Sequence, residues 1–555
     1  MSDENLTFFG IDLGTTYSVV SYIDEAGRPA VVRNVITNDE ITPSVVYFEQ
    51  DTGEVVVGKA AKNVSRLYPS RVVERVKRSM GKEAQWEFDG TPYTPESISA
   101  LILKQLAQDA EYYTQRPVSK VVITVPAYFG LLERDATRKA GRIAGLDVVE
   151  VVPEPVAAAL QYEVGGEASR TVLVYDLGGG TFDTTVIRID PDTVEVLCTD
   201  GDQKLGGADW DARLVQYLVD EFVARAEPAE DPTLDDEFMQ DLALTAEEVK
   251  QQLSVVNSRK VPMRYAGAAA SVEVTRETFE EITADLLDRT IEYTGRTLHT
   301  LGQKLGTDDS AAAIDEVLLV GGSSKMPAVA RRLTERWGWT PRLHDPDMAV
   351  AKGAARYALN RALWAWDGEG AGPTQEQRQE QAEAIALAIG LDEEALQASA
   401  NKRIVTVLPK SFGVKLRDTS FPDWETQPPR LFVEHLVHAN EALAIHREFT
   451  AQTVVEGQTS VEIEIYEQAG AAESPELSAN KPVDKGNGLI TGLPPLPRQS
   501  PIHITMDVSD GGELTLRAVE PSSGKDLVIE VRVSVLSEEE VEQAREVVAG
   551  ITVRG

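Results

Sequence analysis

The chain has 555 residues, 42% of them hydrophobic, and carries a formal net charge of −36. This length predicts several domains with real apolar cores. The acidic balance argues against a nucleic-acid partner held on a broad basic surface, and it disfavours attraction to anionic lipid. Acidity of this kind otherwise indicates solubility and names no partner.

The cysteine and histidine counts bear on compartment and metal chemistry. A single cysteine, Cys198, allows no disulfide within the chain and favours a cytoplasmic protein. Its apolar neighbours indicate a core thiol, since no histidine lies nearby in sequence. The acidic N-terminus lacks a signal-peptide pattern, and no apolar run reaches the roughly 18 to 20 residues of a membrane span. With six histidines in all, a transition-metal site is not expected.

Two stretches share one pattern, an apolar run that ends in aspartate and is followed by glycine and threonine. Residues 8–16 (FFGIDLGTT) contain Asp12, and residues 172–183 (VLVYDLGGGTFD) contain Asp176. A buried strand carries such a carboxylate to the C-terminal edge of a sheet, where open α/β sheets bind ligands. Glycines let backbone N–H groups approach a phosphate, and the carboxylate suits hydrated Mg²⁺. Asp-x-Gly also occurs in ordinary turns, but two copies favour two similar halves that face one nucleotide.

Between the two stretches, the spacing of apolar residues predicts strands at 41–48, 121–125 and 148–152 and helices at 95–113 and 131–145. Residues 66–81 are basic, which fits either a solvated helix face or a phosphate-facing lysine, with Lys77 as the candidate. Glu154 lies between two prolines, so we expect it in a rigid turn at a strand end. There it is either exposed or an acceptor for an attacking water or a hydrated metal.

After the second stretch, the sequence predicts strands at 185–189 and 194–198 and a long helical region from residue 205. Asp209 is a candidate N-cap of that region. A helix is predicted at 245–254, with Thr245 and Glu248 as a capping box. Its polar face either meets a ligand or is simply solvated.

The pattern of predicted elements changes in the last part of the chain. Residues 315–327 predict a third strand, a glycine turn and a helix without an aspartate, which suits an uncharged part of a ligand such as a base. A helix is predicted at 349–366 and a flexible spacer at 367–402. Short alternating strands then recur between turns, which predicts an antiparallel β-domain followed by a short Glu-rich helix at 537–548.

Six signatures in this order resemble the DnaK-type chaperones, the seventy-kilodalton heat-shock proteins. They are GIDLGTTYS (10–18), VPAYF (125–129), EPVAAA (154–159), DLGGGTFD (176–183), LGGAD (205–209) and LVGGS (319–323). The resemblance covers residues 8–360 and, more loosely, the β-domain. It implies an α/β actin-like ATPase with two lobes of duplicated RNase H-like subdomains (1–366), a linker or insertion with short helices (367–402), an antiparallel β-sandwich that binds peptides or a partner (403–536) and a short C-terminal helix as a reduced lid (537–555).

The resemblance also implies roles for single residues. Asp12 and Asp176 are expected to hold hydrated Mg²⁺. The expected catalytic residues are Asp12, Lys77, Glu154, Asp176, Thr181 and Asp183. The expected contacts to ATP or ADP are Gly14, Thr15, Thr16, Tyr17, Gly178, Gly179, Gly180, Gly206, Gly207, Glu247, Lys250, Ser254, Gly321, Gly322, Ser323, Lys325 and Asp347. The implied function is that of an ATP-hydrolysing chaperone that binds client polypeptides, with J-domain co-chaperones and nucleotide-exchange factors as candidate partners.

Three departures from the family pattern leave alternatives open. Gln251 and Lys325 stand where the family has arginines beside the adenine, which predicts weaker nucleotide affinity. The short leucine-rich linker is missing, and residues 404–408 are the candidate substitute. The lid is reduced to about 20 residues, so client binding is expected to be weak or differently gated. The alternatives are an ATP-switched protein for one specific partner and a small-molecule kinase, for which only Asp209 is a candidate base.

Overall fold

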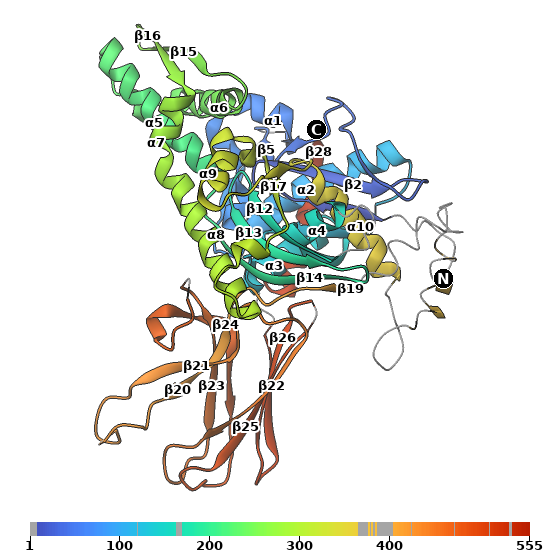
Figure 1. Ribbon diagram of the computed structural model, residues 1–555, viewed down its shortest axis with the longest axis vertical. Coiled ribbons are helices and arrows are strands. Elements are labelled where there is room, and N and C mark those ends of the chain that lie inside the picture. Colours follow the sequence, from blue (N-terminus) through green and yellow to red (C-terminus); the bar gives the residue numbers. More distant parts are fainter. Residues whose placement is uncertain are drawn as a thin grey trace.

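The computed structural model describes residues 8–363 and 403–555, apart from residues 51, 119, 163–168, 423, 471, 510 and 532–535, together with a few positions between 374 and 385. Most of the predicted spacer therefore lies outside the described residues. The described part is a mixed α/β body with a β-sandwich beneath it (Figure 1). No helix in this part of the chain is both long enough and apolar enough to cross a membrane.

The first lobe is built on a sheet with the order β11-β10-β1-β2-β3. Strands β1 (Phe9–Asp12), β10 (Lys120–Val125) and β11 (Asp147–Pro153) are parallel, whereas β2 (Tyr17–Ile23) and β3 (Pro29–Val31) follow antiparallel. Helices α2 (Pro95–Thr114) and α3 (Leu131–Ile143) share its apolar core. The remaining elements are β4 (Thr42–Pro43), β5 (Val45–Phe48), β6 (Glu54–Val57), α1 (Lys59–Val64), β7 (Val72–Glu74), β8 (Trp86–Phe88) and β9 (Thr91–Tyr93).

The second lobe repeats this plan with the order β18-β17-β12-β13-β14-β19. Strands β12 (Arg170–Leu177), β17 (Glu316–Val320) and β18 (Arg342–Leu343) are parallel, and β13 (Phe182–Ile189) and β14 (Thr193–Asp202) follow antiparallel. The helices and hairpin around it are α5 (Gly207–Ala226), α6 (Asp236–Leu253), β15 (Ser258–Tyr265), β16 (Ala268–Thr275), α7 (Arg276–Ile282), α8 (Ala284–Leu305) and α9 (Pro327–Trp337).

Three local predictions in the two lobes differ from the structure. Helix α6 begins at Asp236, because the side chain of Asp235 accepts from the N–H of Phe238, so Thr245 lies in the helix interior and caps nothing. The hairpin β15–β16 was not predicted. In place of a helix, the basic segment 66–81 forms two 3₁₀ turns, Pro69–Arg71 and Val76–Ser79, with β7 between them.

Helices α4 (Glu154–Tyr162) and α10 (Ala349–Leu363) lie between the lobes and join their cores. Glu154 begins α4 directly after β11, so it occupies a helix start and not the expected turn. The two helices touch at Gly353, where a Cβ atom would lie 1.7 Å from the carbonyl oxygen of Ala157. Glycine therefore sets the distance between α10 and the helix that positions Glu154.

The β-sandwich consists of two antiparallel sheets, β21-β20-β23-β24 and β22-β25-β26-β27. Its strands are β20 (Phe412–Arg417), β21 (Leu431–Val437), β22 (Ile445–Gln452), β23 (Val461–Gln468), β24 (Asn480–Ile490), β25 (Pro501–Val508), β26 (Leu514–Glu520) and β27 (Lys525–Val531). Both sheets bury their inner faces in one apolar core. Strand β24 was not predicted, because Pro482, Gly486 and Gly488 hide its strand character.

Residues 403–405, predicted to open the β-domain, belong to the second lobe. They form β19 (Arg403–Val405), which pairs in parallel with β14. This strand pairs with the edge of β14 that is otherwise unpaired, so the backbone groups that face each other on β14 and β19 are hydrogen-bonded. The sandwich itself begins at β20.

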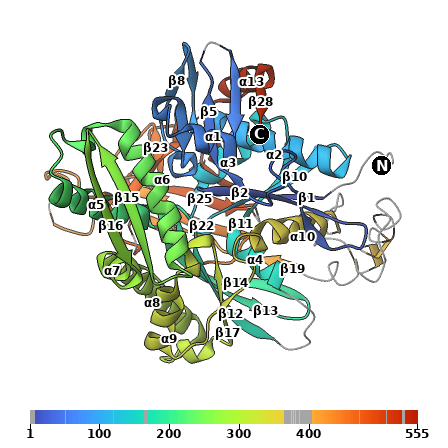
Figure 2. The same ribbon diagram turned by 90° about the horizontal axis from the view of Figure 1, so that it is seen from above.

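The C-terminal helix packs on the first lobe. Helix α13 (Glu538–Gly550) packs against α3 and α2 of the first lobe, and β28 (Thr552–Arg554) pairs in parallel with β6. Figure 2 shows both beside β5 and α2, away from the sandwich strands β22 and β25. The prediction of a helix is confirmed, but its apolar stripe finds its partner on the first lobe.

Candidate active site

Strands β1 and β12 end at one cleft of about 480 Å³ between the two lobes. Asp12 and Asp176 both line it, and each is followed by a glycine turn. The two turns touch, because a Cβ atom on Gly179 would lie 2.0 Å from Thr16 Oγ1 and one on Gly180 would lie 2.5 Å from Thr15 Oγ1. Only glycine permits this contact, which brings the two turns to the same ligand.

A buried ion pair lies at the bottom of the cleft. Lys77 Nζ donates to Glu154 Oε1 at 2.6 Å, with side-chain exposures of 5% and 10%. Asp12 Oδ1 accepts from Thr124 Oγ1 at 3.1 Å, and Asp183 Oδ1 accepts from the backbone N–H of Tyr128 at 3.0 Å. These contacts hold the carboxylates in place before any ligand arrives.

The carboxylates outnumber the cations at this point. Burial, together with the charge of Glu154, raises the pKa of Asp12 to about 7 and that of Asp183 to about 8. The same causes raise the pKa of Asp176 well above its ordinary value. Because the ionised forms are disfavoured, a bound cation would stabilise the site.

The donor set fits a hydrated magnesium ion. Mg²⁺ prefers oxygen ligands and usually keeps several waters while it binds one or two carboxylates and substrate phosphates. Within the described ranges, no group of three or more histidine, cysteine or acidic side chains could hold a metal by itself. Asp12 and Asp176 therefore fit a metal that shares its ligands with water and phosphate.

The upper cleft, which is lined by Lys250, Ser254, Lys325 and Asp347, has two walls that come from different parts of the second lobe. One wall is on α6, where Lys250 Nζ binds Gly207 O at 2.9 Å and Asp211 Oδ1 at 2.7 Å, and Ser254 lies one turn further on. The other wall follows β17, where Lys325 forms an ion pair with Asp347. The lining there also contains Gly321, Gly322 and Ser323.

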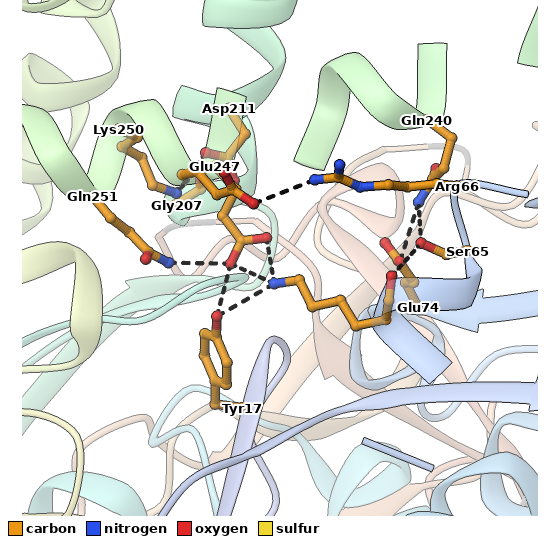
Figure 3. Close-up of polar contacts among 12 residues, drawn as sticks. Tyr17, Ser65, Arg66, Glu74, Gly207, Asp211, Gln240, Glu247, Lys250 and Gln251 are labelled. Carbon is orange, nitrogen blue, oxygen red and sulfur yellow. Dashed lines mark hydrogen bonds and ion pairs between the residues drawn. The ribbon is translucent and has the colours of Figure 1, made fainter. Parts of the chain in front are cut away.

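A polar bridge closes the cleft between the lobes. Lys62 Nζ on α1 donates to both oxygens of Glu247 on α6, at 2.8 and 2.7 Å, and the Tyr17 hydroxyl donates to the same carboxylate at 3.1 Å (Figure 3). Burial opposes the charge of Lys62, but Glu247 outweighs it and raises the pKa of Lys62. Burial likewise opposes the charge of Glu247, but Lys62 lowers its pKa overall. Outside this bridge, Arg66 pairs with Asp241 at 3.2 Å and with Glu248 at 3.3 Å.

Comparison with known proteins identifies the family. The family model described as "Hsp70 protein" matches residues 8–88 and 83–359. Two proteins named "Chaperone protein DnaK", from Thermotoga neapolitana and Thermotoga petrophila, are each 34% identical over 558 residues, which is 98% of this chain and 83% of theirs. The chain belongs to the Hsp70 family.

Most of the residues expected from the Hsp70 resemblance line this one cleft. Four do not: Gly180, Asp183, Gly206 and Gly207. Gly206 packs on Gly180, Gly207 N binds Gly178 O at 2.9 Å, and Asp183 pairs with Asp176 across β12 and β13. These four therefore support the cleft from just behind its surface.

Sequence reasoning missed Lys62 and Arg78. Arg78 Nε donates to Gly180 O at 3.0 Å and its guanidinium pairs with Asp209 at 2.5 Å. Asp209 was predicted as an N-cap, but it is the third residue of α5 and accepts from the N–H of Gly206 at 2.8 Å. Arg78 lies in the basic segment 66–81, but no local pattern marks its partner or that of Lys62, because each partner lies on a segment far along the chain.

Proposed function

We propose that this Hsp70-family protein is a DnaK-like chaperone that hydrolyses ATP with Mg²⁺ and binds client polypeptide segments through its β-sandwich. The observation that carries the proposal is the pair of strands that end in Asp12 and Asp176 at one cleft, with Lys77 and Glu154 buried between them. The relation of the DnaK proteins to nearly the whole chain favours a chaperone over a switch for one partner. The two lobes with matching sheet orders support an actin-like ATPase architecture.

The chain's own residues would act on ATP by positioning and electrostatics, which is most of what phosphoryl transfer requires. Asp12 and Asp176 would hold a hydrated Mg²⁺, whose charge offsets that of the phosphate oxygens. The N–H groups of 179–181 and the hydroxyls of Thr15 and Thr16 would hold the phosphates. Lys77 would stabilise charge that develops on the γ-phosphate.

A water molecule beside that phosphate would be oriented by Glu154 and Thr181, which line the cleft, with Asp183 just behind them. Glu154 is held by Lys77, and Asp183 by the backbone of Tyr128, so both acceptors are preorganised. The walls of the upper cleft would hold the nucleoside, with Glu247 and Lys250 on one side and Ser323 on the other.

The sandwich contacts the nucleotide-binding body at several places that support coupling. Strand β19, just before the sandwich, adds to the edge of β14. Leu131 and Leu132 at the start of α3 pack against the sandwich core, and Arg138 pairs with Glu513 at 3.5 Å. J-domain co-chaperones and nucleotide-exchange factors are the partners that this proposal suggests.

ATP hydrolysis by the purified chain tests the proposal. We expect Lys77→Ala and Asp176→Asn each to lower the rate by about 100-fold or more, as is typical when a transition-state contact is lost. Lys120→Ala, an exposed lysine on β10, is the matched control and should keep the rate of the parent. Equal rates in the parent and both cleft variants would refute the mechanism.

Client binding needs a separate measurement. A fluorescent unfolded peptide should bind with ADP and leave faster with ATP, and a denatured enzyme should regain activity with the chain and ATP. Recovery of one dominant partner without either activity would support the single-partner switch instead.

A further inference from the structure

Residues 536–555, which we call the strap, contribute to the core of the first lobe. Val541 and Val548 are each 1% exposed and Val553 is 7% exposed, and they belong to the apolar cluster that contains Ile98 and Leu101 of α2. The spacing of 541 and 548, with Ala544 between them, puts one apolar stripe on α13. Detachment of the strap from the first lobe would expose that stripe and the core beneath it.

The backbone of the strap completes a sheet of the first lobe. Strand β28 pairs in parallel with β6, with Thr552 opposite Glu54 and Val553 opposite Val55. This makes β28 the edge of a four-stranded sheet that also contains β5 and β7. Main-chain pairing of this kind fixes register and orientation, as it does when a peptide is added to a sheet edge.

Three basic side chains of the first lobe bind the strap at defined points. Lys104 Nζ on α2 donates to the carbonyl oxygens of Val548 at 2.8 Å and Ile551 at 2.9 Å, so it caps the C-terminal end of α13. Lys139 on α3 donates to the carbonyl oxygen of Leu536. Arg142 pairs with Glu538 at 2.6 Å. Carbonyl groups that a helix end leaves unpaired are thus satisfied by the lobe.

The sandwich is attached to a different lobe at each of its ends. Before it in sequence, β19 belongs to the sheet of the second lobe, and after it the strap belongs to the first lobe. Helix α3 lies between the two attachments, with Leu131 and Leu132 on the sandwich core and Lys139 and Arg142 on the strap.

We propose that the strap is a fixed part of the first lobe and keeps the β-sandwich attached to it in every nucleotide state. A lid would have to swing away, but release here would break a sheet, uncap a helix and expose buried valines. Nucleotide exchange therefore tilts the lobes against each other while the sandwich stays docked. This goes beyond the proposed ATPase and chaperone activities, since a chain without hydrolysis would still hold the strap in place.

Distances between spin labels in the full chain test the proposal. Cys198 is buried, so cysteines introduced at the exposed positions Tyr112 on α2 and Val528 on β27 can be labelled selectively. We expect one unchanged distance distribution with ATP and with ADP. Val548→Asp should add a population of longer distances with ADP, whereas Val547→Asp, next to it but 42% exposed, should match the parent. Separation in the parent with ADP, or no change in Val548→Asp, would overturn the proposal.

A disulfide provides a second test that does not depend on the stability of Val548→Asp. Cysteines at Glu54 and Thr552, which are paired positions on β6 and β28, should form a disulfide equally well with ATP and with ADP. The oxidised chain should keep the parent's rates of ATP hydrolysis and peptide release. A disulfide that forms in only one nucleotide state, or that stops either activity, would show that the strap must move. Absence of ATPase activity in the reduced chain would count against the proposed function alone.

Discussion

The bridge from Lys62 to Glu247 should control how fast nucleotide leaves the cleft. Its two hydrogen bonds, at 2.8 and 2.7 Å, join α1 of the first lobe to α6 of the second. Both side chains are largely buried, with exposures of 20% and 11%. We expect a nucleotide held between the lobes to leave when they part, which requires this bridge to break.

The expected size of the effect follows from the chemistry of the bridge. A hydrogen bond to a charged group contributes about 1.5–3 kcal/mol, and each factor of ten corresponds to about 1.4 kcal/mol. Lys62→Ala should therefore speed ADP release by about tenfold to about a hundredfold. Because Glu247 also accepts from Tyr17 at 3.1 Å and from Gln251 at 3.2 Å, the carboxylate keeps two partners in the variant and the chain should still fold.

Stopped-flow release of a fluorescent ADP analogue measures this rate. Lys59→Ala is the matched control, because Lys59 lies on the same helix but pairs with Asp39 within the first lobe. Glu247→Gln should also release ADP faster, and the double variant with Lys62→Ala should be no faster than the faster single variant. Unchanged release from Lys62→Ala, or effects that add in the double variant, would refute the role of the bridge.

Three further outcomes are expected. Burial and Glu154 raise the pKa of Asp183 to about 8, so the folded chain keeps a proton on Asp183 that the unfolded chain loses above about pH 4. The stability that this proton contributes is complete below about pH 4 and is lost as the pH rises through about 8. Melting temperatures measured without nucleotide should therefore depend less steeply on pH in Asp183→Asn than in the parent. Gly353→Ala would put a methyl group 1.7 Å from a backbone oxygen of α4 and should lower the free energy of unfolding by about 1–3 kcal/mol, whereas Gly295→Ala, with open space around it on α8, should raise it by about 0.5–1 kcal/mol in denaturant titrations. Replacing both Gln251 and Lys325 by arginine should tighten ATP binding by about five- to thirtyfold in calorimetry, since each guanidinium beside a base contributes about 0.5–1 kcal/mol, and sub-micromolar affinity of the parent would contradict the reasoning.

The candidate active site was predictable because the sequence patterns that specify it are local. An apolar run that ends in aspartate and glycine specifies a buried strand and a tight turn within a few residues, and this happens at both Asp12 and Asp176. The helices at α2 and α3 were likewise predictable from apolar spacing. The family assignment rests on the same local motifs, and the comparisons confirm it.

The partners of several segments were not predictable. The sequence around Lys62 carries no sign of Glu247, which lies 185 positions further on. Residues 403–405 read as one more strand of the β-domain, and the unpaired edge of β14 decided where they pair. The amphipathic pattern of α13 required an apolar partner but did not say which surface would supply it.

The sequence by itself therefore determined most of the elements and the side chains that follow the two aspartate-ending strands, because strand alternation, helix periodicity and glycine geometry act over a few residues. Only the tertiary structure decided that the lobes are bridged by Lys62, that β19 closes the second sheet and that the strap completes the first lobe. Those choices depend on which edges and apolar faces remain uncovered once the lobes have folded, and that is a property of the assembled surface.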